Sequence, residues 1–335
     1  MVSLIFTVLN EAHSLPELLD SIAAQTRMPD EVVICDGGSR DGTLALLQAE
    51  RRFPLRIIEA PGANISRGRN LAIAAAMHDL ITCSDAGVCL HPEWLARIVQ
   101  PLEAGAHSLV AGFFLPKFRT PFEMAMSATV LPALEDISAT TFLPSSRSVA
   151  FHKSTWQAAG GYPEWIDYCE DLLFDFAARD ACGPFTFVPD AIVYFRPRGS
   201  LRSFYKQYYL YARGDGKANL WLRRHLIRYA TYIAFPLLLA VIMAVAAPWN
   251  ALAALVLLLG AAAYLRTPYR QLTRLWQSAS TAEKLRAALW PPVIRVAGDI
   301  AKMAGYPVGL AWRRRRCSAH AAAPDETGQS PAEKT

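Results

Sequence analysis

The chain has 335 residues, 53% of them hydrophobic, and a formal net charge of +5. This length exceeds one ordinary domain, because a single apolar core rarely grows beyond ~250–300 residues. The basic residues flank apolar segments instead of alternating with exposed aromatics, which argues against a nucleic-acid-binding protein and favours a membrane surface as partner. The six cysteines are scattered without metal-ligand spacing, so we expect reduced thiols.

Short apolar runs alternate with amphipathic stretches through residues 1–112. The predicted strands are Leu4–Val8, Glu31–Asp36, Leu55–Glu59, Leu80–Ser84 and Ser108–Phe113. The predicted helices between them are Leu15–Gln25, Gly42–Arg51, Ser66–Met77 and Pro92–Ala104. This alternation predicts an α/β fold with a mostly parallel, Rossmann-like sheet flanked by helices. Residues 114–200 are less regular, as expected where loops build a binding site.

Two uncharged runs follow, Tyr229–Ala247 and Ala251–Leu265, separated by the turn Pro248–Asn250. A membrane span needs ~17–25 apolar residues. The runs therefore predict a transmembrane helical hairpin, which we favour over a buried core hairpin of a soluble protein. Arginines flank the hairpin on both sides, and by the positive-inside rule both flanks are expected in the cytoplasm.

A third stretch, Ala287–Trp312, carries charges such as Arg295 and Lys302 among apolar residues. Because charges are costly at the bilayer centre, we expect an amphipathic helix at the membrane interface, with a third span as the alternative. Residues 313–335 are expected to form a basic cluster and then a disordered tail. The first residues lack signal-peptide features, so we expect the first ~220 residues to stay in the cytoplasm.

Acidic residues and glycines follow the predicted strands. Glu11 comes after the first strand, Asp36 ends the second before Gly37 and Gly38, and Asp85 follows the fourth. Ligands of open α/β sheets bind beyond the carboxyl ends of such strands. A carboxylate there, next to backbone kept bare by glycine, suits the ribose or base of a nucleotide. No Gly-x-Gly-x-x-Gly follows the first strand, which excludes a Rossmann oxidoreductase.

These blocks, together with Gly160-Gly161-Tyr162 shortly before Glu170-Asp171, resemble family 2 glycosyltransferases of the GT-A fold, and the membrane hairpin resembles that of bacterial members. The resemblance covers roughly residues 1–220. It implies a catalytic domain over residues 1–220 and a membrane region over residues 221–312.

The resemblance also implies functions for individual residues. Asp171 would be the general base, with Glu170 as a supporting acceptor contact. The residues implied to bind the nucleotide-sugar are Glu11, Asp36, Arg67, Arg69, Asn70, Asp85, Arg147 and Arg213. Asp85 occupies the place of the family's Asp-x-Asp metal motif, so a divalent cation, Mg2+ or Mn2+, is implied there. Gly87 replaces the second aspartate of that motif.

We therefore interpret the chain as a nucleotide-sugar-dependent, inverting glycosyltransferase of the hexosyltransferase type. It would act at the cytoplasmic face of a bacterial inner membrane, on a lipid-linked or polysaccharide acceptor, with polysaccharide assembly proteins as possible partners. The alternative is a catalytically silent nucleotide-sugar-binding subunit of a polysaccharide assembly or export complex. A transporter is disfavoured, because two spans cannot enclose a path in one chain. The donor, the acceptor and the number of sugars added per encounter are not specified by the sequence.

Overall fold

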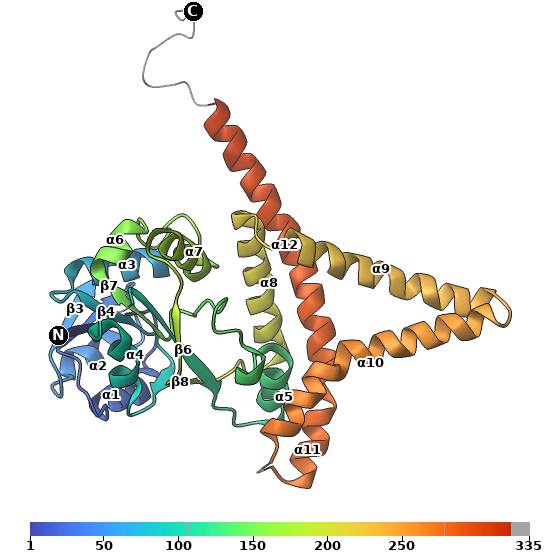
Figure 1. Cartoon of the computed structure of the whole chain (residues 1–335), viewed down its shortest axis with the longest axis horizontal. Coiled ribbons are helices and arrows are strands. Elements are labelled where there is room, and N and C mark those ends of the chain that lie inside the picture. The colour runs from blue at the N-terminus through green and yellow to red at the C-terminus, as the bar shows by residue number, and fades with distance from the viewer. Residues whose placement is uncertain (106, 278, 323–335) are drawn as a thin grey trace, which may run out of the picture.

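The computed structural model describes residues 1–105, 107–277 and 279–322, with side chains as far as Arg316 (Figure 1). The end of the tail that was expected to be disordered, residues 323–335, lies outside the described residues. Figure 1 shows an α/β domain on one side, a pair of long crossing helices beside it, and a helical hairpin that projects away from both.

Within the described residues, eight strands form one sheet in the order β3-β2-β1-β4-β7-β6-β8-β5. Their bounds are Val2–Val8 (β1), Glu31–Asp36 (β2), Leu55–Glu59 (β3), Leu80–Cys83 (β4), Val88–Leu90 (β5), Leu109–Pro116 (β6), Val149–His152 (β7) and Thr186–Phe195 (β8). Strands β3, β2, β1 and β4 are parallel, as expected. Beyond β4 the sheet is mixed, because β7 runs antiparallel to both of its neighbours.

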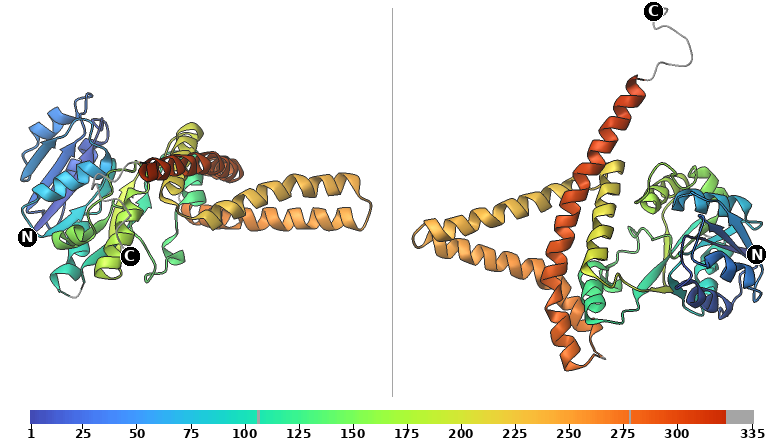
Figure 2. Two further views of the ribbon diagram at one scale, coloured as in Figure 1. Left: turned by 90° about the horizontal axis from the view of Figure 1, so that it is seen from above. Right: turned by 180° about the vertical axis from the view of Figure 1, so that it is seen from behind.

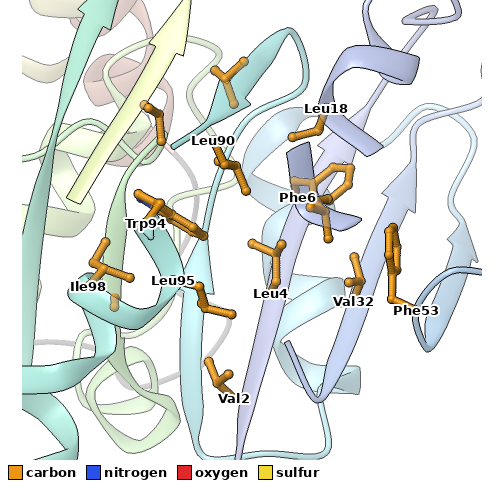
Figure 3. Close-up of a cluster of buried hydrophobic side chains, with 14 of the residues drawn as sticks. Val2, Leu4, Phe6, Leu18, Val32, Phe53, Leu90, Trp94, Leu95 and Ile98 are labelled. Carbon is orange, nitrogen blue, oxygen red and sulfur yellow. The ribbon is translucent and has the colours of Figure 1, made fainter. Parts of the chain in front are cut away.

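Helices cover both faces of this sheet. The helices before the C-terminal part are Leu15–Ala23 (α1), Thr43–Ala49 (α2), Ile65–Ala75 (α3), Trp94–Glu103 (α4), Pro121–Val130 (α5), Lys153–Ala158 (α6), Glu170–Cys182 (α7) and Leu201–Ala218 (α8), with a 3-10 turn at Leu134–Asp136. Of these, α5 and α8 pack with the C-terminal helices. The apolar alternation of β1 explains the two layers, since successive side chains of a strand point to opposite faces. Leu4 and Phe6 pack with Trp94 on one face (Figure 3). Ile5 packs with Ile73 on the other face.

The C-terminal part is helical, with Leu222–Ala244 (α9), Trp249–Leu275 (α10), Thr281–Ala288 (α11) and Trp290–Ala322 (α12). Among the described residues, α9 and α10 are the two helices long and apolar enough to cross a membrane. In the most apolar 18-residue stretch of each helix, 0% of α9 and 11% of α10 is buried in the protein. Many of their apolar side chains are therefore exposed. The hairpin that carries them projects away from the rest of the protein (Figure 2). This exposure is the opposite of a soluble core hairpin and supports membrane association.

Helix α12 packs along α8, and the two meet through glycines. A Cβ at Gly305 would lie 2.2 Å from the carbonyl oxygen of Tyr209, and one at Gly309 would lie 2.1 Å from that of Arg213. The two backbones therefore touch directly. Of the charged residues in this stretch, Asp299 accepts from Arg228 Nε at 2.6 Å, while Arg295 and Lys302 lie over the rings of Tyr264 and Tyr208. The interfacial placement expected for Ala287–Trp312 stays a prediction, and the helix continues unbroken to Ala322.

Candidate functional site

The loops after β1 and β2 are clamped to each other. The backbone N–H of Asn10 donates to Ser39 Oγ at 2.8 Å, and Arg40 N–H donates back to Asn10 Oδ1 at 2.9 Å. The N–H of Glu11 donates to Thr43 Oγ1 at 2.8 Å. Asn10 has a φ of 57°, an uncommon left-handed conformation that turns the chain so that the Glu11 side chain lines a cavity.

Asp36 shapes this loop and does not line the cavity. Its carboxylate accepts from the Ser39 backbone N–H at 3.0 Å and from the Ser39 hydroxyl, and the side chain is 2% exposed. The adjacent Gly37 lines the cavity in its place. A Cβ at Gly37 would approach the carbonyl oxygen of Ala63 to 3.3 Å, so glycine keeps this wall open. The turn lies where the sequence predicted it, and the direct nucleotide contact expected of Asp36 stays a prediction.

Helix α3 separates the two arginines that the sequence had grouped together. Asn64 caps the helix by accepting from the Arg67 backbone N–H. Arg67 is exposed and lines neither of the cavities described below. Arg69, two residues further on, lies on the buried face and is 2% exposed. Its Nη2 donates to Asp85 Oδ1 at 2.7 Å, and its Nη1 donates to Glu170 Oε1 at 2.9 Å.

Asn70, which was expected near the nucleotide, instead holds the paired-glycine loop. Its Nδ2 donates to the carbonyl of Tyr162 at 2.8 Å, and its Oδ1 accepts from the Tyr162 N–H at 2.8 Å. Gly160 and Gly161 have φ values of 75° and 76°. Because a Cβ at Gly161 would lie 3.0 Å from Asn70 Oδ1, both the conformation and the close approach require glycine. The buried Tyr162 ring then packs under Arg69, whose guanidinium carbon lies 5.2 Å from the ring centroid.

The Glu170-Asp171 pair opens α7 after a strained residue. Cys169 has a φ of 70°, a conformation that costs a residue with a side chain about 1–3 kcal/mol. Its thiol donates to Asp215 Oδ1 at 3.3 Å. The strain turns the chain sharply, so that both carboxylates begin the helix and line one cavity.

Burial dominates the electrostatics of this acidic group. It raises the pKa of Glu170 to about 7, with the neighbouring Asp171 charge adding to the effect and Arg69 opposing it. Burial also raises the pKa of Asp171, again against the attraction of Arg69. Asp175, one helical turn further along α7, has its pKa raised well above the usual range by burial and by Asp171. These shifts favour proton uptake near neutral pH.

Asp85 lies in the turn between β4 and β5, between two arginines. Its Oδ1 pairs with Arg69, and its Oδ2 lies 3.6 Å from Arg147 Nε, too far for a hydrogen bond. Arg147 is held over the Phe195 ring, with its guanidinium carbon 4.8 Å from the centroid. Gly87 has a φ of 79°, and a Cβ there would lie 4.0 Å from Glu11 Oε2. A second aspartate at this position would therefore face a carboxylate and adopt an unfavourable backbone conformation.

Two adjoining cavities meet at Asp85. The first, which we call the strand-end cavity, has a volume of about 920 Å3 and is lined by Glu11, Gly37, Gly68 and Arg198 among others. The second, the carboxylate cavity, has a volume of about 500 Å3 and is lined by Glu170 and Asp171. The residues shared by both linings are Ile65, Asp85, Arg147, Tyr208 and Tyr211.

Arg213 does not approach this junction. Its Nη2 donates to Asp167 Oδ2 at 3.0 Å, and its backbone packs against Gly305 and Gly309 of α12. It is absent from the linings of both cavities. In the structure this part of α8 is used for helix packing, and the diphosphate contact expected of Arg213 stays a prediction.

Residues 3–156 match the model of glycosyl transferase family 2. The matched segment contains both clamped loops, Arg69, Asp85 and Arg147. The protein carries a family 2 glycosyltransferase domain. The family and the enzyme class predicted from the strand-end motifs are thereby confirmed.

Curated relatives extend the likeness of this glycosyltransferase beyond the matched segment. An O-antigen chain rhamnosyltransferase of Salmonella typhimurium is 22% identical over 62% of this chain and 70% of its own length. An undecaprenyl-phosphate 4-deoxy-4-formamido-L-arabinose transferase of Serratia proteamaculans is 33% identical over 31% of this chain. That match spans about a third (34%) of the arabinose transferase's own length.

Among solved structures, a mannosyltransferase from Pyrobaculum calidifontis in complex with GDP-Man and Mn2+ covers 87% of this chain and 86% of its own. It is 22% identical, with a TM-score of 0.60. The likeness confirms the GT-A-type fold of the glycosyltransferase.

A divalent cation in this glycosyltransferase would have few protein ligands. The described part of the chain contains no group of three or more His, Cys, Asp or Glu side chains placed to hold a metal ion. Asp85 Oδ2 is the atom available at the cavity junction. This fits Mg2+-type sites, which use one or two carboxylates and take their remaining ligands from substrate phosphates and water.

Asp175 and the α9 and α12 residues that line the carboxylate cavity were not predicted from the sequence to be site residues. Asp175 follows Asp171 at the i+4 spacing that places both on one helix face. Its position next to Asp171 could therefore have been predicted from the sequence. Trp221, Arg224, His225 and Lys302 also line the cavity. They belong to the segments assigned to the membrane region, and no local pattern connects them to α7.

Proposed function

We propose that this glycosyltransferase moves a sugar from a nucleotide-sugar in the strand-end cavity to an acceptor hydroxyl in the carboxylate cavity. The observation that carries the proposal is that Asp85 lines both cavities. A donor with its nucleotide beside Gly37 and Gly68 would have its sugar at this junction, beside the acidic group of α7.

Asp171 acts as the general base. The acceptor hydroxyl gives its proton to the Asp171 carboxylate while its oxygen forms a bond to the anomeric carbon of the donor sugar. The bond from that carbon to the diphosphate oxygen breaks, and the nucleoside diphosphate leaves with the electron pair. The resemblance to family 2 makes this an inverting displacement. The raised pKa of Asp171 brings the base closer to the working pH, which favours proton transfer.

The departing diphosphate needs positive charge. Arg147 lies at the junction, and its guanidinium is 3.6 Å from the Asp85 carboxylate, too far for a hydrogen bond. We assign it to the diphosphate, together with a divalent cation on Asp85 Oδ2. When bound, such a cation would neutralise charge that develops on the leaving group. Arg69 is a positioning residue, because its pairing with Asp85 and Glu170 holds the two carboxylates at the junction.

The acceptor is assigned to the lipid-linked or saccharide class, and the catalytic domain to the cytoplasmic face of a bacterial inner membrane. Support comes from the outward-facing apolar hairpin and from the arginines at both of its ends. The names of the two curated relatives, an O-antigen chain rhamnosyltransferase and an undecaprenyl-phosphate transferase, agree with this class of acceptor.

A panel of UDP-, GDP- and dTDP-sugars tests the proposal. The full-length protein in detergent should be thermally stabilised by one donor class, and that donor should release its nucleoside diphosphate on incubation with membrane lipid extract. The Asp171→Asn variant should keep the stabilisation and lose the release. Stabilisation without release in the wild-type protein would favour the silent subunit, and stabilisation by no donor would refute a nucleotide-sugar enzyme.

A further inference from the structure

The carboxylate cavity continues beyond the catalytic group to the base of the membrane hairpin. Its lining includes Trp221, Arg224 and Arg228 at the start of α9 and Lys302 on α12. A hydrogen-bonded path connects the two regions through Asp215. Its Oδ1 accepts from the Cys169 thiol at 3.3 Å, and its Oδ2 lies 3.2 Å from His225 Nε2. The reacting carboxylates and the membrane-proximal cations therefore line one continuous cavity.

Two of these cations have no carboxylate partner. Arg228 pairs with Asp299 at 2.6 Å. Arg224 instead stacks its guanidinium on the Trp221 ring at 4.2 Å, and Lys302 Nζ lies 4.9 Å from the Tyr208 ring centroid. Within the described residues neither cation forms an ion pair.

Lys302 is held in this place at a cost. Burial, together with the neighbouring positive charge of Arg228, lowers the pKa of Lys302 to about 8. A largely desolvated cation without an ion-pair partner is unfavourable. An arriving anion would compensate the charge of Lys302 and offset its repulsion by Arg228. The position is therefore suited to an anionic ligand that comes and goes.

The surroundings indicate what the anion is attached to. Leu226 and Ile227, in the first turns of α9, are 56% and 58% exposed, and they begin the apolar surface that continues along the hairpin. A ligand with its anionic group at Arg224 and Lys302 would meet hydrocarbon-compatible surface on one side and Asp171 on the other. A bulk phospholipid at the membrane surface would need no enclosed connection to a general base.

We propose that Arg224 and Lys302 bind the headgroup phosphate of a lipid-linked acceptor whose saccharide extends to Asp171. This inference rests on the proposed function and specifies its acceptor as an anionic polyprenyl-type lipid. The same phosphate chemistry occurs in free inorganic phosphate and in bilayer phospholipids, so the test separates these sources.

The probe is farnesyl phosphate, titrated calorimetrically into the full-length protein in neutral detergent. Farnesol, inorganic phosphate and phosphatidylglycerol are titrated in parallel. Farnesyl phosphate should bind more tightly than each of them, with an affinity that falls as salt is raised. Arg224→Gln and Lys302→Gln should each weaken it roughly tenfold or more, because each removes one charge-assisted contact. Lys302→Arg, which keeps the charge, should retain most of the affinity.

Arg223→Gln is the matched control, because Arg223 is exposed on the same helix turn and lines neither cavity. Equal binding of farnesol, inorganic phosphate or phosphatidylglycerol would overturn the headgroup site, as would equal losses in the Arg223 and Arg224 variants. Thermal unfolding of each variant separates weak binding from misfolding. Donor turnover is measured separately: its persistence without phosphate-dependent binding refutes only this site, whereas its absence refutes the proposed function.

Discussion

Arg69 donates to Glu170, 101 positions further along the chain, at 2.9 Å, and through its other terminal nitrogen it also holds Asp85. One buried guanidinium thus joins the helix after β3, the turn after β4 and the start of α7. Donor-side and acceptor-side carboxylates meet because Arg69 compensates both of their charges. The consequences of this arrangement can be measured.

Replacing the proposed base should stop transfer without preventing donor binding. We expect Asp171→Asn to lower kcat by roughly 10²–10⁴-fold, the usual contribution of a positioned general base, with little change in donor affinity. Steady-state nucleoside diphosphate release and donor titration measure the two quantities. The control is Asp180→Asn, an exposed carboxylate near the end of the same helix. A variant at Asp171 that keeps full activity would remove it from the mechanism.

The activity should depend on pH near neutrality. The pKa of Glu170 is raised to about 7 and that of Asp171 is also raised, so the coupled pair takes up a proton as pH falls through about 7 and loses basic character. We expect kcat/KM to decline below this pH. Glu170→Gln removes a neighbouring negative charge and should move the decline to lower pH. An acid limb near pH 4 in the wild-type enzyme would contradict this assignment.

The same shifts have a consequence for stability. A carboxyl group whose pKa is raised on folding holds its proton more tightly in the folded state. The free energy of unfolding should therefore fall as pH rises from the ordinary carboxyl pKa toward about 7, and level off above it. Denaturant titrations at several pH values measure this slope, which Glu170→Gln should reduce.

Removing Arg69 should destabilise the domain. Arg69→Gln leaves Glu170 and Asp85 without their buried partner, and breaking a buried pair on one side costs about 3–5 kcal/mol. Arg67→Gln, two residues away on the exposed face of α3, is the matched control and should change little. Chemical denaturation of the full-length variants in detergent compares them. Equal effects would show that the burial of Arg69 does not matter.

The effects of the divalent cation and of Arg147 on donor binding and activity should be distinguishable by mutation. A chelator should lower activity, and Mn2+ or Mg2+ should restore it. Asp85→Asn should abolish the difference between chelated and metal-loaded enzyme, whereas Arg147→Gln should reduce donor affinity roughly tenfold or more and leave the metal response intact. Donor titrations with and without metal test both statements. Full activity of wild-type enzyme in chelator would refute the cation on Asp85.

The glycines between α8 and α12 should be sensitive to a single methyl group. Gly309→Ala would place its Cβ 2.1 Å from the carbonyl oxygen of Arg213, so the helices must separate, at a cost of about 1–3 kcal/mol or more. Gly260→Ala in α10 is the control, because nothing lies within 4 Å of its Cβ position. Gly309→Ala should lower the thermal unfolding midpoint more than Gly260→Ala does. Equal midpoints would mean that the contact is loose.

The strands could be predicted from the sequence more closely than the contacts that individual side chains make. Glu31–Asp36 and Leu55–Glu59 were predicted with the observed bounds. The first contains a buried apolar run, whereas the second is a partly exposed edge strand that was recognised from the alternation of strands and helices. The short β5 was missed, because its three residues carry no periodicity. Asp36 and Asn70 were assigned to the nucleotide, yet their side chains hold loops, and only tertiary contacts distinguish these uses.

The spacing of residues along α3 shows which side chains lie on its buried face, and this information was not used in the prediction. Arg69 precedes Ala72 and Ile73 at i+3 and i+4, the spacing of one helix face, and both are buried. That pattern separates Arg69 from Arg67 without coordinates. No comparable signal leads to Arg224 or Lys302, because their approach to α7 depends on a chain path that leaves the domain and returns.

That return has a mechanical consequence. The hairpin of α9 and α10 begins after α8, and the chain returns through α11 to α12, which is in direct backbone contact with α8. The end of α10 packs with α5, α8, α11 and α12 in one apolar cluster, so both ends of the hairpin are held by the same group of helices. In the proposed membrane placement, a hairpin anchored in this way would fix the height of the reaction centre above the lipid, whereas a single flexible tether would let it swing. The choice among acceptors would then depend on their stem length, which would have to bridge this set distance.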